Sequence, residues 1–179
     1  LMIRRPPRST RKESSAASDV YKRQVMSLKT RFGNLGNILD FDNLTEEDIY
    51  VLDSPILTNS QFKKFNKFFQ KKIKTIDCTF DINLSLKDRI EDIKEDCETA
   101  VREGSTVLIL SDKNISNDRA SIPTILAVGA VHSHLVKLGL RGYCSLNVES
   151  SDALDTHSFA VLIGVGATTV NPYLAIDCI

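Results

Sequence analysis

Apolar positions in the second half of the chain alternate between short continuous runs and longer stripes with helical spacing. Val107–Leu110 is an unbroken apolar run, which is typical of a parallel strand covered on both faces. After a polar loop, Ser121–Leu138 is almost wholly apolar, and Pro123 suits the first turn of a helix there. Before the run, Ser85–Arg102 has an apolar stripe of period 3.6 and Gly104 in the position of a helix stop. The pattern predicts helix, buried strand, helix.

The same unit repeats toward the end of the chain. We expect strands over Ile73–Ile82, Tyr143–Val148 and Ala167–Val170, and a further amphipathic helix over Asp152–Ile163. Helices that alternate with buried strands predict a parallel sheet with right-handed crossovers. The predicted fold class is therefore α/β, a partial β/α-barrel-like parallel sheet with flanking helices.

The first half of the chain carries a weaker pattern. Phenylalanines at helical spacing predict a short helix over Ser60–Phe69, whose lysines suggest either a membrane-surface helix or, the reading we favour, a helix docked by its aromatic face. Pro55 favours extended chain over Leu52–Leu57, and a short helix is expected over Leu44–Tyr50. The glycine and asparagine turns before Asp42 predict an extended linker.

Residues 1–24 differ from the rest, being rich in Arg, Ser and Pro without apolar periodicity. They resemble the translation of a sequencing adapter, and we exclude them from fold reasoning. Seven of the 23 basic but two of the 23 acidic residues lie there, so the remainder has a net charge of −5. An acidic remainder gives no reason to expect nucleic acid or an anionic membrane as a partner. The expected partners thus include neither nucleic acid nor membrane.

The cysteines do not form a motif. Cys78, Cys97, Cys144 and Cys178 are widely spaced, which favours reduced and mostly buried thiols over a metal or disulfide role. No apolar run approaches the roughly 18 residues needed to span a bilayer.

Candidate chemistry gathers where the predicted strands end, because parallel α/β folds collect their active groups at that rim. Asp112 and Lys113, Glu149, and Asn171 each follow a predicted strand. They could form a small-ligand site, or they could cap helices and pair with one another, which we favour. His132 and His134 lie two apart on a helix and cannot chelate one metal together. No catalytic, cofactor-binding or metal-ligating residue is assigned from these patterns.

Long blocks of the sequence resemble the central domain of glutamate synthase. The blocks occur in the family's order and together cover residues 26–179: SLKTRFGNLGNILD (27–40), LDSPIL (52–57), AVREGSTVLILSDK (100–113), IPTILAVGAVHSHL (122–135), SLNVESSD (145–152) and HSFAVLIGVGATTVNPYLA (157–175). Small departures from the family's pattern fall at Lys113, Ser133 and Ser151-Asp152.

The resemblance implies a division of the chain and a role for it. Residues 25–50 would be a linker from a glutaminase domain, and 51–179 the central domain, truncated at its carboxyl end. Such enzymes make two glutamates from glutamine, 2-oxoglutarate and a reductant. The central domain connects the glutaminase and FMN domains of the same chain and helps shape the ammonia path, without catalytic groups of its own.

Cofactors and partners follow from the same resemblance. The full-length family uses FMN and an iron–sulfur cluster, none of it expected in this piece, and receives electrons from ferredoxin or an NAD(P)H-oxidising subunit. The expected location is the cytoplasm or the plastid stroma. The alternative function is a self-contained α/β-barrel-like enzyme or binding domain, with a small-ligand site at the strand rim.

Overall fold

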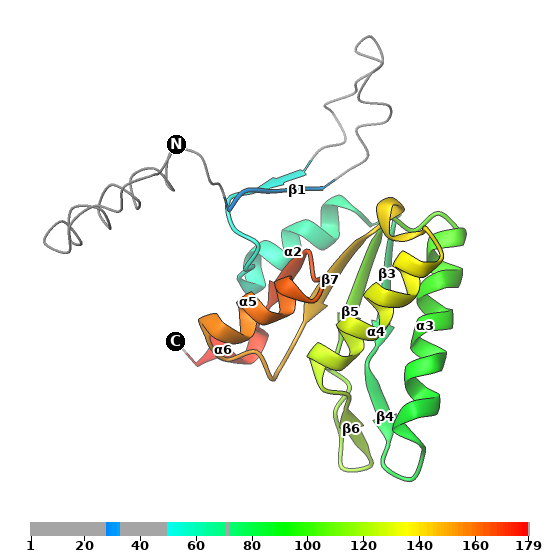
Figure 1. Cartoon of the computed structure of the whole chain (residues 1–179). Coiled ribbons are helices and arrows are strands. Elements are labelled where there is room, and N and C mark those ends of the chain that lie inside the picture. Colours follow the sequence, from blue (N-terminus) through cyan, green and yellow to red (C-terminus); the bar gives the residue numbers. More distant parts are fainter. Residues whose placement is uncertain (1–27, 33–49, 71, 179) are drawn as a thin grey trace, which may run out of the picture.

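The computed structural model describes residues 28–32, 50–70 and 72–178 (Figure 1). The predicted linker before Asp42, apart from residues 28–32, and the helix expected before Tyr50 lie outside the described residues. In chain order the elements are β1 (Thr30–Phe32), β2 (Tyr50–Leu52), α2 (Asn59–Phe68), β3 (Ile73–Asp77), β4 (Thr79–Asp81), α3 (Leu86–Arg102), β5 (Val107–Ser111), β6 (Arg119–Ser121), α4 (Thr124–Lys137), the 3₁₀ helix η4 (Arg141–Tyr143), β7 (Ser145–Glu149), α5 (Thr156–Gly164), β8 (Thr169–Asn171) and α6 (Tyr173–Asp177).

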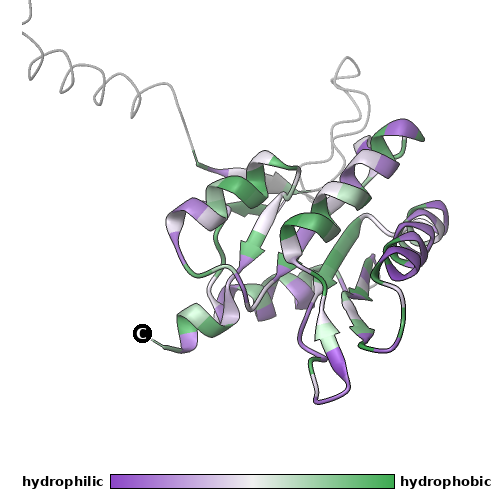
Figure 2. Cartoon of the chain, turned by 60° about the horizontal axis from the view of Figure 1, so that its bottom comes forward, coloured by the Kyte–Doolittle hydropathy of each residue, from purple (hydrophilic) through white to green (hydrophobic). Residues whose placement is uncertain are grey.

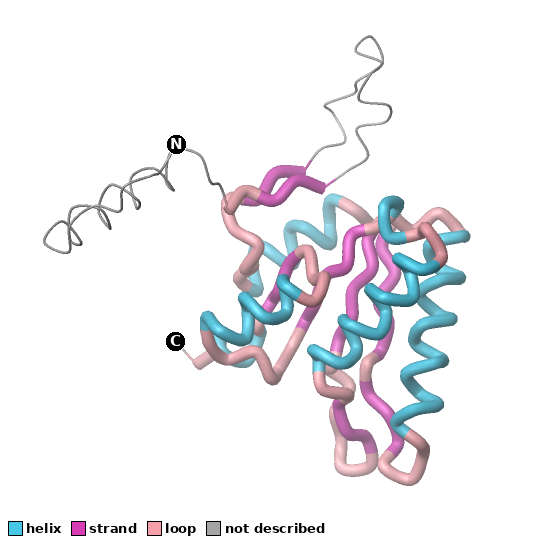
Figure 3. Tube along the Cα trace, viewed as in Figure 1, coloured by secondary structure: helices cyan, strands magenta, loops and turns pink. Residues whose placement is uncertain are grey.

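The centre of the molecule is a four-stranded parallel sheet in the order β3-β5-β7-β8. The four strands lie in the sheet in the same order as they occur along the chain. Helices α3, α4 and α5 form the crossovers between them (Figure 3). The sheet grows in one direction from β3 to β8, and its crossovers have the same handedness. All three helices therefore lie on the same face, as in a section of a β/α barrel. The predicted fold class is confirmed.

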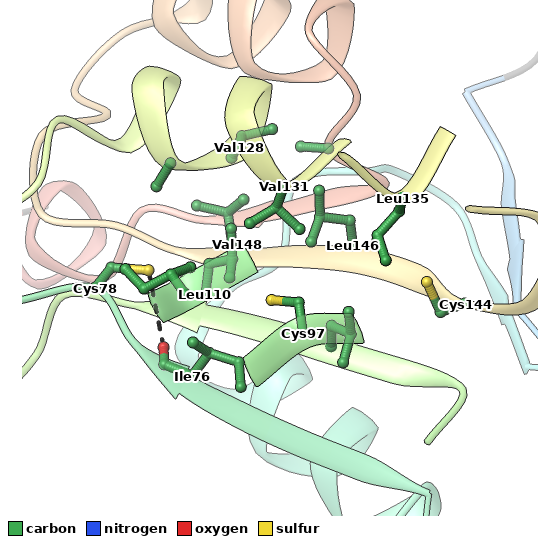
Figure 4. Packing of buried hydrophobic residues seen from close by; sticks show 14 of the residues in the cluster. Ile76, Cys78, Cys97, Leu110, Val128, Val131, Leu135, Cys144, Leu146 and Val148 are labelled. Carbon is green, nitrogen blue, oxygen red and sulfur yellow. Dashed lines mark hydrogen bonds between the residues drawn. The ribbon is translucent and has the colours of Figure 1, made fainter. Parts of the chain in front are cut away.

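The helix face of the sheet carries the larger apolar core (Figure 4). Side chains from alternate positions of the strands, such as Leu110, Leu146 and Val148, pack against Val131 and Leu135 of α4. Ile93 and Cys97 of α3 close the same core, as the apolar stripe predicted. Burial of these apolar side chains is the dominant stabilising contribution in such a fold.

Helix α2 and the β1–β2 hairpin cover part of the opposite face. Phe62 and Phe65 of α2 and Phe69 at its C-cap are buried in one cluster with Phe32, and the rings of Phe32 and Phe65 meet edge to face with centroids 4.9 Å apart. The predicted docking of this helix by its aromatic side is thus observed, although Phe68 stays half exposed. Thr58 begins the helix through a reciprocal capping box with Gln61.

Helix α3 begins and ends where its sequence indicates. The Ser85 hydroxyl accepts a hydrogen bond from the Asp88 backbone N–H at the first turn. Gly104 has φ +96°, a left-handed conformation that glycine adopts without steric cost and that ends helices.

Two sequence predictions about strands were wrong. The segment Ile73–Ile82 is two strands, because the chain changes partners at Cys78: β3 pairs with β5, and β4 pairs with β6 in an antiparallel ladder. Strand β6 lies in the loop predicted to be a polar turn. The two-stranded β4–β6 arm projects from the carboxyl end of the parallel sheet (Figure 1).

Three other predicted elements begin later than expected, and one of them is β8, which starts at Thr169 rather than Ala167. Helix α5 starts at Thr156 rather than Asp152, because Asp155 is its N-cap and accepts a hydrogen bond from Ser158 N–H at 2.7 Å. Strand β7 starts at Ser145, since Tyr143 belongs to the 3₁₀ helix η4.

The outer edge of β8 is closed by the segment before α2. Val170 N–H donates to the Pro55 carbonyl, and Leu57 N–H donates to the Val170 carbonyl, both at 2.9 Å. Ile56 and Val170 therefore form a parallel bridge, and the extended chain predicted around Pro55 covers a sheet edge. An edge strand whose backbone groups are already bonded cannot pair with another strand there.

Candidate functional site at the carboxyl rim

Lys113 and Glu149 meet at the carboxyl ends of β5 and β7. Lys113 Nζ lies 2.5 Å from Glu149 Oε1, and the Ser111 hydroxyl donates to Glu149 Oε2 at 2.8 Å. Glu149 is largely buried while the Lys113 side chain is half exposed. Both oxygens of the buried carboxylate are thus engaged, as burial of a charge requires.

Asp112 points into the protein beside this pair. Its Oδ2 accepts hydrogen bonds from the Ser151 backbone N–H at 2.8 Å and from the Ser151 hydroxyl at 2.6 Å. The residue is almost fully buried, so these bonds tie the loop after β5 to the loop after β7. The other oxygen, Oδ1, is buried without a hydrogen-bond partner among the described residues.

Tyr173, at the start of α6, lies near Lys113. Burial raises the pKa of its phenol to about 12, and the nearby Asp112 carboxylate adds to the rise. Lys113 Nζ lies 5.0 Å from the centre of the Tyr173 ring, within the range of a cation–π contact. A phenol held neutral in this way is a poor general base at neutral pH.

Asn171 uses its side chain elsewhere. Its amide donates to the Leu57 carbonyl at 2.9 Å and to Asn59 Oδ1 at 3.0 Å. These bonds tie the end of β8 to the start of α2. The four predicted rim residues therefore share one end of the sheet, but Lys113 and Glu149 alone bind each other.

Sequence reasoning missed the role of Asp152. Its Oδ2 accepts the Thr124 backbone N–H at 3.0 Å, and its other oxygen accepts the Ser150 hydroxyl. Pro123 precedes α4 and gives it no side-chain cap, so a carboxylate from another loop satisfies the first turn. A negative charge is favourable at a helix N-terminus. A helix that starts at proline without a capping side chain is the signal for such a partner.

A second polar cluster, also missed, joins the β4–β6 arm to the sheet. Asp77 Oδ2 lies 2.9 Å from Arg119 Nη2, and Asp77 Oδ1 accepts from the Thr79 N–H and hydroxyl. Burial alone would raise the pKa of Asp77, but the hydrogen bonds from Thr79 and Asn114 and the Arg119 charge outweigh it and lower the pKa. The cluster is internally satisfied.

His132 and His134 also have structural partners. Arg141 Nε donates to His132 Nδ1 at 3.2 Å, and His134 Nε2 lies 2.9 Å from Glu98 Oε2, joining α4 to α3. Gly166 has φ +121°, and a Cβ there would lie 2.3 Å from His132 Nδ1. The close approach requires glycine.

Three of the four thiols are poor nucleophiles. Cys78, Cys97 and Cys144 are buried, and burial raises the pKa of each, that of Cys78 to about 12. Cys178 is exposed. Among residues 28–32, 50–70 and 72–178, no three His, Cys, Asp or Glu side chains are grouped to hold a metal ion. The described helices include none long and apolar enough to cross a membrane.

The fold and the rim together define an α/β domain of β/α-barrel type whose polar groups hold loops and helix ends together. The family model described as "Glutamate synthase central domain" matches residues 19–179, and the chain belongs to this family.

The curated relatives are several times longer than this chain. The "Glutamate synthase [NADPH] large chain" of Azospirillum brasilense is 50% identical over 161 residues, which cover 88% of this chain and 11% of the relative. The "Ferredoxin-dependent glutamate synthase, chloroplastic" of Spinacia oleracea is 38% identical over 159 residues, covering 86% and 10%. The large chain of Bacillus subtilis is 38% identical over 153 residues, covering 84% and 10%. The chain thus spans about a tenth of the length of these relatives.

Proposed function

We propose that this chain is a central-domain segment of a glutamate synthase, the enzyme that forms two glutamates from glutamine, 2-oxoglutarate and a reductant. In that enzyme the segment connects the glutaminase and FMN domains and helps shape the ammonia path between them. Its own residues carry out no chemical step. The observation that supports this proposal is the internal pairing of the rim: the buried carboxylate of Glu149 already binds the Lys113 ammonium and the Ser111 hydroxyl.

The cofactors of the proposed enzyme would bind outside this segment. An iron–sulfur cluster needs several cysteines in one place, whereas the buried thiols of the described residues sit in the apolar core. A flavin phosphate needs free positive charge or free N–H groups, and the Lys113 ammonium at the rim is paired with Glu149. The electron donor, ferredoxin or an NAD(P)H-oxidising subunit, belongs to the whole enzyme, and the location is cytoplasmic or plastidic.

A segment exchange tests the proposal. Residues 26–179 would replace the matching stretch of the Azospirillum brasilense large chain. As a control, the matching stretch of the Bacillus subtilis large chain would replace it in a second chimera, which shows whether the host chain tolerates an exchange at this place. We expect glutamine-dependent glutamate formation within about tenfold of the parent, which corresponds to about 1.4 kcal/mol in activation free energy. A chimera that binds flavin and hydrolyses glutamine normally, yet forms no glutamate while the control does, would contradict the proposal.

The 179-residue chain alone provides a second test. We expect it to hydrolyse no glutamine and to bind no FMN, measured by ammonia release and by flavin absorbance after purification. Flavin that co-purifies at a stoichiometric level would favour the alternative, a self-contained enzyme.

A further inference from the structure

Arg141 of η4 carries a positive charge that forms no ion pair among the described residues. Its hydrogen-bond acceptors there are neutral groups: His132 Nδ1, the carbonyls of Cys144 and Gly166, and the Thr168 hydroxyl. A guanidinium has five N–H donors, so these four bonds leave one N–H on Nη1 without a partner in the described part of the chain. A half-buried charge without an ion-pair partner favours an anion beside it.

Arg141 lines a cavity of about 280 Å³ at the amino end of the parallel sheet. The cavity lies where β5 and β7 begin, and Phe32 and Phe69 of the aromatic cluster also line it. Among the described residues that line the cavity, Arg141 is the one with a full charge, and none is Asp or Glu. Pockets for drug-sized ligands measure roughly 300–1,000 Å³. A cavity just below that range suits a small molecule rather than a flavin nucleotide.

Two threonines that line the cavity have hydroxyl groups that are free to donate. Thr168 Oγ1 accepts from Arg141 Nη2 at 3.3 Å and from the Leu146 N–H at 3.1 Å, and it donates to no described residue. The Thr106 hydroxyl makes no hydrogen bond with a described residue. Since a hydroxyl rotates to suit its acceptor, a ligand oxygen can receive a threonine O–H together with the Arg141 N–H. The bonds that Arg141 makes within the fold stay intact.

Arg141 differs in this respect from the charged groups of two other cavities. A cavity of about 450 Å³ that shares Tyr143 is lined by Arg102, but the Nε of Arg102 lies 2.8 Å from Glu98 Oε1. Both belong to α3, which is mostly purple in Figure 2 because its outward residues carry charges of both signs. A cavity of about 210 Å³ is lined by Asp152, which already caps α4. Within the described residues, the charge of Arg141 alone faces its cavity without such a partner.

The composition of the cavity indicates the class of ligand. Guanidinium N–H groups match the geometry of a carboxylate. One positive charge balances one negative charge, and Phe32 and Phe69 favour an organic chain over inorganic phosphate. We propose that the cavity binds a small organic carboxylate, with its charged end at Arg141 and its short apolar chain against the two phenylalanines. The site lies at the end of the sheet opposite the carboxyl rim, and it goes beyond the proposed function, which it does not require.

A titration of the 179-residue chain with pentanoate, followed by the amide signals in NMR spectra, tests the site. We expect saturable shifts of the amides of residues 142–145 and of Thr168. Pentanol and pentylammonium have the same chain without the negative charge, and they should bind at least about tenfold more weakly, because a hydrogen bond to a charged group is lost. Equal binding of pentanol would overturn the proposal. So would the absence of a saturable shift up to about 50 mM pentanoate, a concentration that fills even a millimolar site.

Three variants locate the bound carboxylate. Arg141→Met should raise the Kd for pentanoate at least about tenfold, and Thr106→Val about three- to tenfold, the effect of one neutral hydrogen bond. Thr106→Val breaks no hydrogen bond between described residues, so it carries the test if Arg141→Met does not fold. The control Arg102→Met removes a positive charge from the neighbouring cavity and should leave the Kd unchanged. An unchanged Kd in Thr106→Val, or an equal loss in Arg102→Met, would overturn the proposal.

Hydrogen exchange of the chimeric large chain gives the same information if the chain alone does not fold. Pentanoate should slow amide exchange in the peptides that cover residues 142–145, because a bound ligand suppresses local opening. The effect should be smaller in the Thr106→Val chimera at the same pentanoate concentration. Exchange that is equal with and without pentanoate in the unmodified chimera would overturn the proposal.

Discussion

Leu146 and Asn147 are neighbours on β7 and are both fully buried, yet they are stabilised in different ways. Leu146 faces the helices and lies in the apolar core. Asn147 faces the other way, where its Oδ1 accepts the Thr169 hydroxyl at 2.7 Å and its amide donates to the Leu108 carbonyl at 3.1 Å. One face of this strand is held by apolar packing and the other by hydrogen bonds. The second face specifies strand register, because one residue of slip leaves every bond unmade.

We expect the largest loss of folding stability from a substitution on the apolar face of β7. Leu146→Ala removes a fully buried side chain and should lower the free energy of unfolding by about 2–5 kcal/mol, the range for cavity-forming leucine substitutions. Urea unfolding of the chain, followed by circular dichroism, measures it. The control Leu154→Ala, at an exposed position, should change stability by no more than about 0.5 kcal/mol. Similar losses in the two variants would contradict this placement of the core.

We expect the next largest loss of folding stability from a substitution on the polar face of β7. Asn147→Ala should cost about 1–3 kcal/mol, because the Leu108 carbonyl and the Thr169 hydroxyl lose their partner. Thr169→Val alone should also destabilise, and the double variant should lose less than the sum of the single losses, as expected of groups in contact. Additive losses would show that the two side chains do not interact.

The sequence predicted the apolar face better than the polar one. The continuous run Val107–Leu110 and the stripe of Ser85–Arg102 identify β5 and α3, because apolar burial imposes a period on the sequence. Asn147 in an alternating strand looks like a residue facing water, since hydrogen-bond partners from β5 and β8 are distant in sequence. Asp152 was expected at the start of α5 for the same reason. It caps α4 from a loop that only the fold brings near.

Strand β6 could not be predicted by periodicity either. The strand has only three residues, Arg119 to Ser121, too few to show a period. It pairs with β4, and Arg119 also contacts Asp77 and Thr79. Asp112 and Lys113 directly follow the last residue of β5, and Glu149 and Asn171 are the last residues of β7 and β8. The sequence pattern does not reveal which of these side chains already have hydrogen-bond or ion-pair partners within the fold.

The Asp77 cluster should give a smaller, pH-dependent effect. In the folded state the pKa of Asp77 is lowered from 3.8. The ionised carboxylate therefore stabilises the fold above about pH 4, and this contribution is lost as the pH falls through the lowered pKa. Asp77→Asn should therefore flatten the decline of unfolding free energy below about pH 4. Denaturant unfolding at several acidic pH values measures this slope. An unchanged slope in the variant would show that Asp77 is not stabilised by Arg119 and Thr79.

The most direct test of a non-catalytic role lies at the rim. In the segment-exchanged large chain, Lys113→Met and Glu149→Gln would each be assayed for glutamine-dependent glutamate formation at saturating substrate. A structural pair predicts a turnover number within about threefold of the unmodified chimera, because replacing a side chain that acts as neither general acid nor general base removes no chemical step. A loss of about 10²-fold or more with intact flavin content and folding, the size expected for a lost general acid or base, would contradict the account.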